Sequence, residues 1–293
     1  MANELAALSN ALAAVVEGAG QAVVAVHARP RFSSSGVFWR PGIIVTAEHT
    51  IRREEEITVT LPGGSTVPAT LAGRDAGTDI AVLRVEASGA APLPKSSGAP
   101  APGNLALAIG RSQDSGTNAT LGIVSAVSGS WQTWRGGRLD HYIRLDLTVY
   151  PGSSGGAVIN VEGQVIGIAS SALSRIAGVA IPSVTIDRIV EELLARGHVA
   201  RGYLGLGLQP VDLPDHRKGL IVVSLEPEGP AAKAGVLLGD IFLSLADQAV
   251  ADTDDLRGVL ESHGVGATVE AAVLRGGNPN KLPILVGQRP RRG

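Results

Sequence analysis

Short apolar segments separated by turn residues restrict most of this chain to a β-rich fold. Val, Ile and Leu concentrate in these segments between residues 21 and 181, with turn clusters such as Pro62-Gly63-Gly64 and Glu162-Gly163 between them. The segments predict strands at Ala22–Ala28, Gly42–Val45, Ile57–Leu61, Ile80–Val85, Leu105–Ile109 and Gln164–Ala169. Strands at this spacing with few helices between them indicate a sandwich or a barrel.

The pattern changes at two places, which we take as boundaries. Residues 88–103 are rich in Pro, Ala, Gly and Ser and predict a connection between two halves of the β region. Further on, apolar residues recur at helical spacing and Gly197 ends the predicted helix. These residues are Ile186, Ile189, Val190, Leu193 and Leu194. The first domain is therefore expected to cover residues 21–198.

Residues 199–287 predict a second, smaller domain that mixes helices and strands. Its expected strands are Tyr203–Gln209, Gly219–Ser224, Ile241–Ala246, Thr268–Leu274 and Leu282–Val286, and its expected helices are Ala231–Ala234 and Asp254–Ser262. Residues 288–293 predict a loose basic tail.

The first 20 residues predict an amphipathic helix that docks on the body, with Asn3 as N-cap and Gly18 as its end. Its apolar stripe consists of Leu5, Leu8, Leu12, Val15 and Val16. This stretch has no Lys or Arg, unlike a signal peptide. No apolar run approaches the roughly 20 residues of a membrane span. We therefore expect a soluble, cytoplasmic protein, or an extracytoplasmic one if a signal or anchor precedes this sequence.

Composition excludes several classes of function. The formal net charge of −2 argues against nucleic acid as the main partner. The absence of Cys excludes disulfides, thiolate metal sites and a cysteine nucleophile. No metal-binding constellation stands out, and no cofactor is implied.

A glycine-flanked serine is the first candidate for chemistry. In Tyr150-Pro151-Gly152-Ser153-Ser154-Gly155-Gly156-Ala157, glycines on both sides of Ser154 allow a tight turn. In such a turn the amides of Gly152 and Ser154 point at one spot, where they stabilise an oxyanion. Taken alone, the segment fits a flexible loop equally well.

The same residues match the nucleophile elbow G-x-S-x-G of α/β-hydrolase esterases. That elbow lies between a strand and a helix, and its acid and His follow the Ser in the sequence. Here residues 158–168 predict a strand, a tight turn and another strand. The esterase hypothesis therefore lacks the structure that it requires.

Candidates for a base and its orienting acid stand upstream, in the order His, Asp, Ser. His49 stands just after the apolar segment Ile43–Ala47, with Glu48 between them, and Asp79 directly precedes Ile80–Leu83. A lone His is more often structural, and a lone Asp before a strand is more often a turn residue. Three such residues, each at a strand edge, favour a catalytic triad.

The blocks around His49, Asp79 and Ser154 resemble those of HtrA/Deg serine proteases, as do Leu121–Ser125 and Val179–Pro182. The resemblance covers nearly the whole chain. It implies a mainly β fold, a chymotrypsin-like double six-stranded β-barrel followed by an α+β PDZ domain.

The resemblance also implies roles. His49 is the general base, Asp79 orients it, Ser154 is the nucleophile, and the amides of Gly152 and Ser154 form the oxyanion hole. The sequence departs from the family at Thr50, Ser153 and Ala157, where Val, Asn and Pro are more usual. No departure removes a catalytic group, so only fine positioning is in question.

The second domain resembles the PDZ modules attached to these proteases. Arg201–Leu206 is similar to their carboxylate-binding loop, which implies peptide binding by Tyr203, Leu204, Gly205 and Leu206. Gly229–Val236 followed by Gly239-Asp240-Ile241 matches the helix–turn–strand pattern of these modules. Their usual Asn-Gly turn is absent, and Asp247-Gln248 stands there.

The resemblance extends to the primary specificity pocket. Thr148, six residues before the nucleophile, stands where trypsin has an Asp, with Val149 beside it. No acid is present there to pair with Lys or Arg, so we expect small to medium aliphatic residues before the cleaved bond. Asp146 is expected to make a structural hydrogen bond instead.

These features together predict a serine endopeptidase that acts on unfolded or damaged proteins and binds peptide C-termini at its PDZ domain. The alternative is a peptide-binding adaptor or chaperone, but no triad residue is lost. The resemblance also implies a homotrimer. Residues 29–36 form too short a loop for cage-building arms, and the helix near Leu5–Val16 with Phe32 or Phe38 is expected to supply the contact. A monomer with this helix packed on its own barrel is the other possibility.

Overall fold

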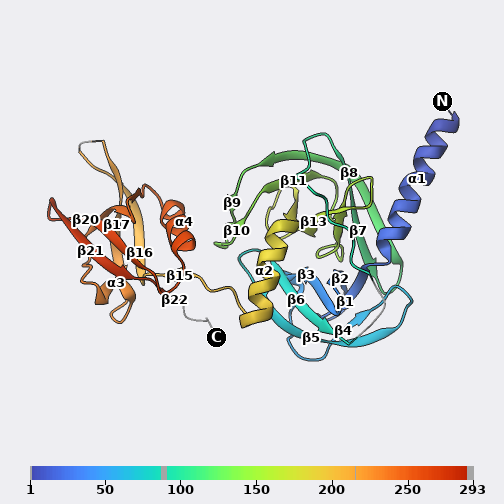
Figure 1. Cartoon of the computed structure of the whole chain (residues 1–293), viewed down its shortest axis with the longest axis horizontal. Helices are drawn as coiled ribbons and strands as arrows, with labels where there is room; N and C mark the ends of the chain where they lie inside the picture. Colours follow the sequence, from blue (N-terminus) through green and yellow to red (C-terminus); the bar gives the residue numbers. More distant parts are fainter. Residues whose placement is uncertain (1, 87–90, 215, 289–293) are drawn as a thin grey trace. The chain divides into compact units, whose positions relative to one another are not determined.

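The chain forms two compact units, residues 1–199 and residues 200–293. The structure, a computed structural model, describes residues 2–86, 91–214 and 216–288 (Figure 1). Each unit has its own hydrophobic core. Most of the predicted basic tail therefore lies outside the described residues, as do residues 88–90 of the predicted connection.

The first half of the first unit is a closed six-stranded barrel in the order β1-β2-β3-β6-β5-β4. Its strands are β1 (Val23–His27), β2 (Ser34–Arg40), β3 (Ile43–Ala47), β4 (Ile57–Thr60), β5 (Thr66–Asp75) and β6 (Ile80–Val85). Their inward side chains, among them Val24, Phe38, Ile44 and Leu83, form one buried cluster. Phe38 is only 2% exposed, so the prediction that it could serve a contact between chains is wrong.

The second half is another closed barrel, in the order β11-β14-β13-β12-β7-β8. Its strands are β7 (Leu105–Ser112), β8 (Gly116–Ser128), β11 (Tyr142–Asp146), β12 (Ala157–Ile159), β13 (Val165–Ser170) and β14 (Gly178–Pro182). A small hairpin of β9 (Trp131–Gln132) and β10 (Arg138–Leu139) stands between β8 and β11. The predicted double barrel is confirmed, and the largest core cluster is formed by side chains of both barrels.

The described part of this unit contains two α-helices. Helix α2 (Ser183–Arg196) ends at Gly197, whose φ of +74° suits glycine, as the sequence predicts. Helix α1 (Ala2–Gly20) begins before Asn3 and runs past Gly18, so both predicted end residues are wrong.

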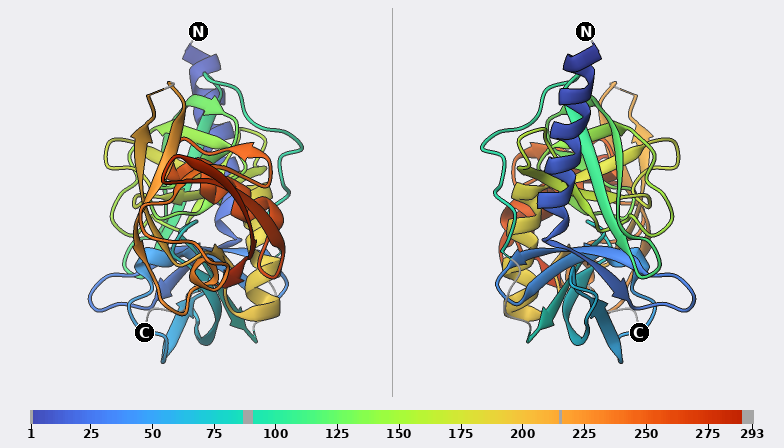
Figure 2. Two further views of the ribbon diagram at one scale, coloured as in Figure 1. Left: turned by 90° about the vertical axis from the view of Figure 1, so that its left-hand side faces the viewer. Right: turned by 90° about the vertical axis from the view of Figure 1, so that its right-hand side faces the viewer.

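Helix α1 lies along β7 and β8 on the outside of the second barrel (Figure 2). Leu12, Val15 and Val16 pack against the core. Leu5 and Leu8, nearer the N-terminus, are 69% and 51% exposed. The predicted docking therefore holds for three of the five residues of the apolar stripe. No helix in the described residues is both long enough and apolar enough to cross a lipid bilayer.

The second unit is built on a sheet in the order β16-β17-β18-β20-β21, with β19 paired to β18. The strands are β16 (Leu206–Asp212), β17 (Lys218–Leu225), β18 (Ile241–Leu245), β19 (Gln248–Ala249), β20 (Thr268–Arg275) and β21 (Asn278–Leu285). Strands β15 (Gly202–Tyr203) and β22 (Gly287–Gln288) form a separate pair, and the helices are α3 (Pro230–Lys233) and α4 (Thr253–His263).

The tight turn in this unit falls one residue earlier than the sequence suggests. Ala246 and Asp247 turn the chain between β18 and β19, both with positive φ, whereas Gln248 already lies in β19. Positive φ at both central residues is the type I′ requirement that Asn-Gly normally meets. Ala246 and Asp247 therefore adopt the turn that Asn-Gly usually forms, although their side chains suit positive φ less well.

Candidate active site

His49 lies on a single 3₁₀ turn, Glu48–Thr50, that directly follows β3. The buried hydroxyl of Thr50 donates a hydrogen bond of 2.7 Å to the carbonyl of Ala47 and so closes this turn. The departure from the family's usual Val thus adds a bond that holds the turn. The His49 side chain remains 17% exposed, which leaves part of the ring open to a reactant.

Asp79 is fully buried and accepts hydrogen bonds from three groups. The Nδ1 of His49 lies 2.9 Å from both carboxylate oxygens, and the backbone amide of His49 lies 2.9 Å from Oδ1. Ser170 Oγ donates to Oδ2 at 2.5 Å. A carboxylate only accepts, so Nδ1 carries the proton and Nε2 is left as the basic nitrogen.

The backbone at Asp79 is in the left-handed region, with φ of +59°. For a residue other than glycine this conformation costs of order 1–3 kcal/mol. The preceding turn is held by Asp75, whose carboxylate accepts from the amide and the hydroxyl of Thr78 at 2.9 and 2.7 Å. The carbonyl of Asp79 also accepts from the Glu48 amide at 3.0 Å. These bonds direct the Asp79 carboxylate at His49.

Ser154 lies in a turn that its neighbouring glycines make possible. Gly155 has φ of +85°, and a Cβ there would stand 2.2 Å from the carbonyl oxygen of Ser35. The Gly155 amide donates to the carbonyl of Ala169 at 2.8 Å, and the carbonyl of Ser154 accepts from the Ser35 amide at 3.1 Å. Strands of both barrels thus fix this turn, in contrast to a flexible loop.

The two amides expected to form the oxyanion hole have no internal partner in the described residues. Gly152, at φ of +97°, turns its carbonyl to Ser35 Oγ, which donates at 2.8 Å. Neither the Gly152 amide nor the Ser154 amide donates a hydrogen bond to the described part of the chain. Two free backbone donors beside a nucleophile have the character of an oxyanion hole.

The hydroxyl of Ser154 is not hydrogen-bonded to His49 in this structure. Its partner within the described residues is Ser171 Oγ at 2.9 Å, and Ser154 is only 4% exposed. The structure thus brings His49 and Asp79 into direct contact and leaves Ser154 on a competing bond. Loose geometry of this kind is common where no substrate is bound.

Glu48 adds charge next to His49. Its side chain is 14% exposed, and Arg74 Nε and Arg135 Nη1 lie 3.9 and 3.6 Å from its carboxylate oxygens. Burial raises the pKa of Glu48, and the nearby Arg74 partly offsets that effect. The carboxyl therefore keeps its proton to a higher pH than an exposed Glu does.

The residues predicted for the primary pocket lie after β11. Val149 is half-buried, and its Cγ2 lies 3.1 Å from the place where a Cβ on Gly178 would stand. Thr148 is exposed, and its carbonyl accepts from Thr120 Oγ1 at 3.0 Å. Asp146 is exposed too, and its carboxylate makes no hydrogen bond within the described residues, so the structural bond expected of it is absent.

In the second unit, the predicted carboxylate-binding loop leads into an edge strand. Strand β16 has a neighbour, β17, on one side in its sheet. Gly205 has φ of +76°, and its carbonyl accepts from the Glu226 amide at 2.9 Å. The amides of Leu204 and Gly205 donate to nothing in the described part of the chain. Tyr203 pairs with Gly287 in β15 and β22.

Three serines of the site escape sequence analysis: Ser35, Ser170 and Ser171. Each binds a group far along the chain, as Ser170 binds Asp79 across 91 residues. No local pattern signals such a contact. Among the described residues, no three His, Asp or Glu side chains gather into a metal-binding cluster.

The two barrels, the His–Asp pair and the glycine-bounded serine define a trypsin-like serine peptidase joined to a PDZ domain. The trypsin-like peptidase domain family matches residues 34–168, and the PDZ domain family matches residues 202–286. The chain belongs to the HtrA/Deg family of serine endoproteases. It is a serine-type endopeptidase.

Individual relatives agree with this assignment. The chain is 29% identical over 265 residues to the serine endoprotease DegS of Haemophilus influenzae, covering 87% of this chain and 77% of that protein. It is 32% identical to a probable periplasmic DegP-like serine endoprotease of Halomonas elongata, with 89% of this chain aligned. The chain spans only 57% of that DegP-like relative.

Solved structures match over most of the chain. The crystal structure of the serine endoprotease from Yersinia pestis has a TM-score of 0.80 and 30% identity, and covers 94% of this chain and 97% of its own. The HtrA-type protease AlgW, solved with a decapeptide, has a TM-score of 0.81 and 27% identity, and covers 96% of this chain and 99% of its own.

Proposed function

We propose that this chain cleaves unfolded or damaged proteins, with Ser154 as nucleophile, His49 as general base and Asp79 as the acid that orients His49. The observation that carries the proposal is the buried Asp79 carboxylate, which binds His49 Nδ1 at 2.9 Å and leaves Nε2 basic. The fixed turn of Ser154 supports the choice of nucleophile.

The reaction begins when the Ser154 hydroxyl leaves Ser171 and turns to His49 Nε2. His49 takes the proton as Ser154 Oγ attacks the peptide carbonyl, and Asp79 stabilises the imidazolium that forms. The amides of Gly152 and Ser154 donate hydrogen bonds to the carbonyl oxygen and stabilise the negative charge that develops on it. His49 then gives its proton to the leaving amine, and water releases the acyl group by the same steps.

The primary pocket accepts small to medium aliphatic side chains. The half-buried Val149 beside Gly178 supports an apolar wall, and exposed Thr148 brings no charge to it. A substrate Lys or Arg would find no acidic partner at Thr148 or Val149. Cleavage after Lys or Arg is therefore expected to be rare.

The PDZ domain binds peptide C-termini by adding them as a strand to the edge of β16. The unpartnered amides of Leu204 and Gly205 support capture of the terminal carboxylate. The AlgW structures with a decapeptide and a tripeptide support peptide binding in this family. Such a peptide either delivers a substrate or regulates the protease.

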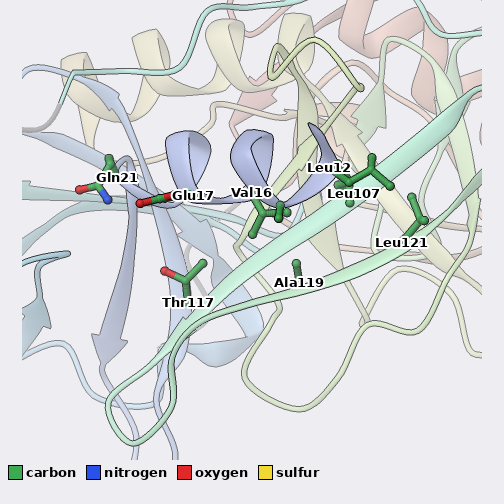
Figure 3. Close-up of a pocket in the computed structure, with 9 residues that line it drawn as sticks. Leu12, Val16, Glu17, Gln21, Leu107, Thr117, Ala119 and Leu121 are labelled. Atoms are coloured by element: carbon green, nitrogen blue, oxygen red, sulfur yellow. The ribbon is translucent and has the colours of Figure 1, made fainter. Parts of the chain in front are cut away.

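The protein assembles as a homotrimer through the outer face of α1. Leu5 and Leu8 are exposed there, and Leu121 of β8 is 50% exposed nearby. A cavity of about 460 Å³ lies between α1 and strands β7 and β8, lined by Leu12, Val16, Leu107 and Leu121 among others (Figure 3). Exposed apolar surface of this kind supports a contact between chains. The exposed Phe32 fits the same role.

The compartment is extracytoplasmic. The DegP-like relatives of Halomonas elongata and Brucella suis are named periplasmic, which supports this location. Fractionation of the native host checks it: recovery with the cytoplasmic marker alone contradicts the proposal.

Cleavage of unfolded casein separates the protease from a peptide-binding adaptor. We expect wild-type protein to degrade casein, and Ser154→Ala to stay folded but lose about 10⁶-fold of the rate, as removal of a triad serine does. Ser96→Ala, which changes a half-buried serine outside the site, serves as the matched control. Equal degradation by Ser154→Ala and wild type would exclude Ser154 as the nucleophile.

A further inference from the structure

The hairpin of β9 and β10 touches the segments that carry Asp79 and His49, and the segment whose Ser171 binds Ser154. At its base, the buried hydroxyl of Thr133 donates to the carbonyl of Gly77 at 2.6 Å. A Cβ on Gly137 would stand 2.2 Å from the carbonyl carbon of Gly77. The hairpin is therefore pressed against the turn that leads into Asp79.

The tip of the hairpin reaches the other two segments. Arg135 Nη1 lies 3.6 Å from Glu48 Oε2, next to His49. Trp134 Nε1 donates to the carbonyl of Ala172 at 3.4 Å. Ala172 directly follows Ser171, the partner of Ser154, so the indole lies beside the segment that contacts the proposed nucleophile.

Trp134 is an exposed aromatic side chain held in place. Its side chain is 69% exposed, whereas Trp39 is 3% exposed and Trp131 is half-buried. The guanidinium carbon of Arg135 lies 4.8 Å from the ring centroid, a cation–π contact that covers part of the ring. Because Glu48 also holds Arg135, the ring is pre-organised and offers apolar surface to a ligand.

The position of Ala172 indicates whether the Trp134 ring lies near substrate residues before or after the cleaved bond. The segment from Ser171 to Gly178 comes back beside Val149 of the primary pocket, 3.1 Å from the Cβ position of Gly178. That pocket takes the residue before the cleaved bond. Trp134 therefore lies on the acyl side of the substrate.

We propose that Trp134 is a specificity-determining residue that packs against an apolar substrate side chain upstream of the one in the primary pocket. The inference rests on the proposed function of Ser154 and its pocket. The indole supplies a large, rigid apolar surface, and Arg135 on one side of it disfavours a basic side chain at that substrate position. The occupant is thus an apolar or aromatic residue of an extended peptide.

Two internally quenched peptides test the inference. The two peptides of a pair share one cleavage site and differ at a single residue upstream of it, which is Leu in one peptide and Ser in the other. Further pairs place this residue at each successive upstream position. We expect wild type to favour the Leu peptide in kcat/KM, by about 10-fold at the position that meets the ring. Trp134→Ala should abolish this preference while it leaves the Ser peptide nearly unchanged. Trp134→Phe should keep most of the preference.

Controls separate the inference from the function on which it rests. Val161→Ala removes an exposed apolar side chain from the turn between β12 and β13 and should change neither peptide. Labelling of Ser154 by a small fluorophosphonate reports the catalytic machinery without reaching Trp134. If the fluorophosphonate labels Trp134→Ala poorly, Trp134→Gln replaces it in the comparison of the Leu and Ser peptides, because Gln keeps a planar side chain.

Normal labelling with the Leu preference intact in the Trp134 variants would overturn the inference alone. A wild-type protein that the fluorophosphonate does not label would overturn the proposed function, and the inference with it.

Discussion

The hydroxyl of Ser154 is bound to Ser171 in this structure, and under the proposed mechanism this bond competes with the one to His49. Ser171 holds it at 2.9 Å. Catalysis requires the bond to His49 instead. A net hydrogen bond of this kind contributes about 0.5–1.5 kcal/mol, so Ser171 lowers the share of molecules ready to react by up to about 10-fold.

Ser171→Ala should therefore label with a fluorophosphonate several times faster than wild type, because Ser154 is released toward His49. Second-order rate constants measured at one pH provide the comparison, with Ser96→Ala as the control. A slower rate for Ser171→Ala would mean that Ser171 assists the attack.

The residues found from sequence and those missed differ in a physical way. His49, Asp79 and Ser154 each stand next to a buried strand or between glycines, so local composition marks them. Ser35 and Ser170 gain their roles only through closure of the barrels, since their partners are 117 and 91 residues away along the chain. The resting rotamer of Ser154 is a tertiary contact that no motif encodes.

Among the elements, the edge of β16 determines what the PDZ domain can bind. Residues 200–288 contain a core of their own, which includes Leu220, Phe242 and Val273. Expressed alone, they should bind a peptide with an apolar last residue and lose it when the C-terminus is amidated, because the Leu204 and Gly205 amides then face no carboxylate. Isothermal titration of the two peptides measures this. Equal affinities would contradict carboxylate capture.

The same domain contains an ion pair between the buried Asp240 and the partly exposed Arg275, which makes its stability depend on pH. Asp240 is 1% exposed and accepts from Arg275 Nε and Nη2 at 2.9 and 2.8 Å and from the Leu237 amide at 2.9 Å. The hydrogen bond from Arg275 lowers the pKa of Asp240. The stabilisation is therefore fully present above about pH 4 and is lost as the pH falls through the depressed folded-state pKa.

Asp240→Asn should accordingly lower the free energy of unfolding of residues 200–288 by about 2 kcal/mol at pH 7, as loss of a charged hydrogen-bonded pair does. The difference from wild type should shrink when urea unfolding is repeated at pH 3. Asp254→Asn, whose side chain is 63% exposed, serves as the control. A difference independent of pH would contradict the role of the ion pair.

Prediction of the elements succeeded where side chains are uniformly apolar and failed where they alternate. Strand β6 matches its predicted bounds, and every residue in it but Arg84 is buried. Strand β8 alternates between half-buried and exposed residues over most of its length, and only its stretch around Leu121–Ser125 was found, through family resemblance. Strand β2 was missed because Ser34, Ser35 and Gly36 resemble a loop, although both serines are fully buried.

At the scale of the whole molecule, the proposed trimer depends on apolar side chains that the single chain leaves exposed. Substitution of Leu5 and Leu8 by Glu should release monomers, because charge on α1 opposes burial between chains. Light scattering after size-exclusion chromatography should give wild type about three times the 29.9 kDa of one chain. Leu238→Glu, an equally exposed position in the second unit, is the control.

A wild-type mass near 29.9 kDa at micromolar concentration would contradict the trimer. A mass near six or more chains would contradict the inference from the short loop of residues 29–36, of which β2 already takes 34–36.

The proposed triad is divided between the two barrels, and this division determines how much of the chain must fold before the site is complete. A nascent chain that has emerged only as far as β6 carries His49 and Asp79 but no nucleophile. Ser154 precedes β13 and β14, which the second barrel needs in order to close, and β13 supplies Ser170 to Asp79. The proposed triad is therefore complete only once β13 and β14 have been synthesised and the second barrel has closed.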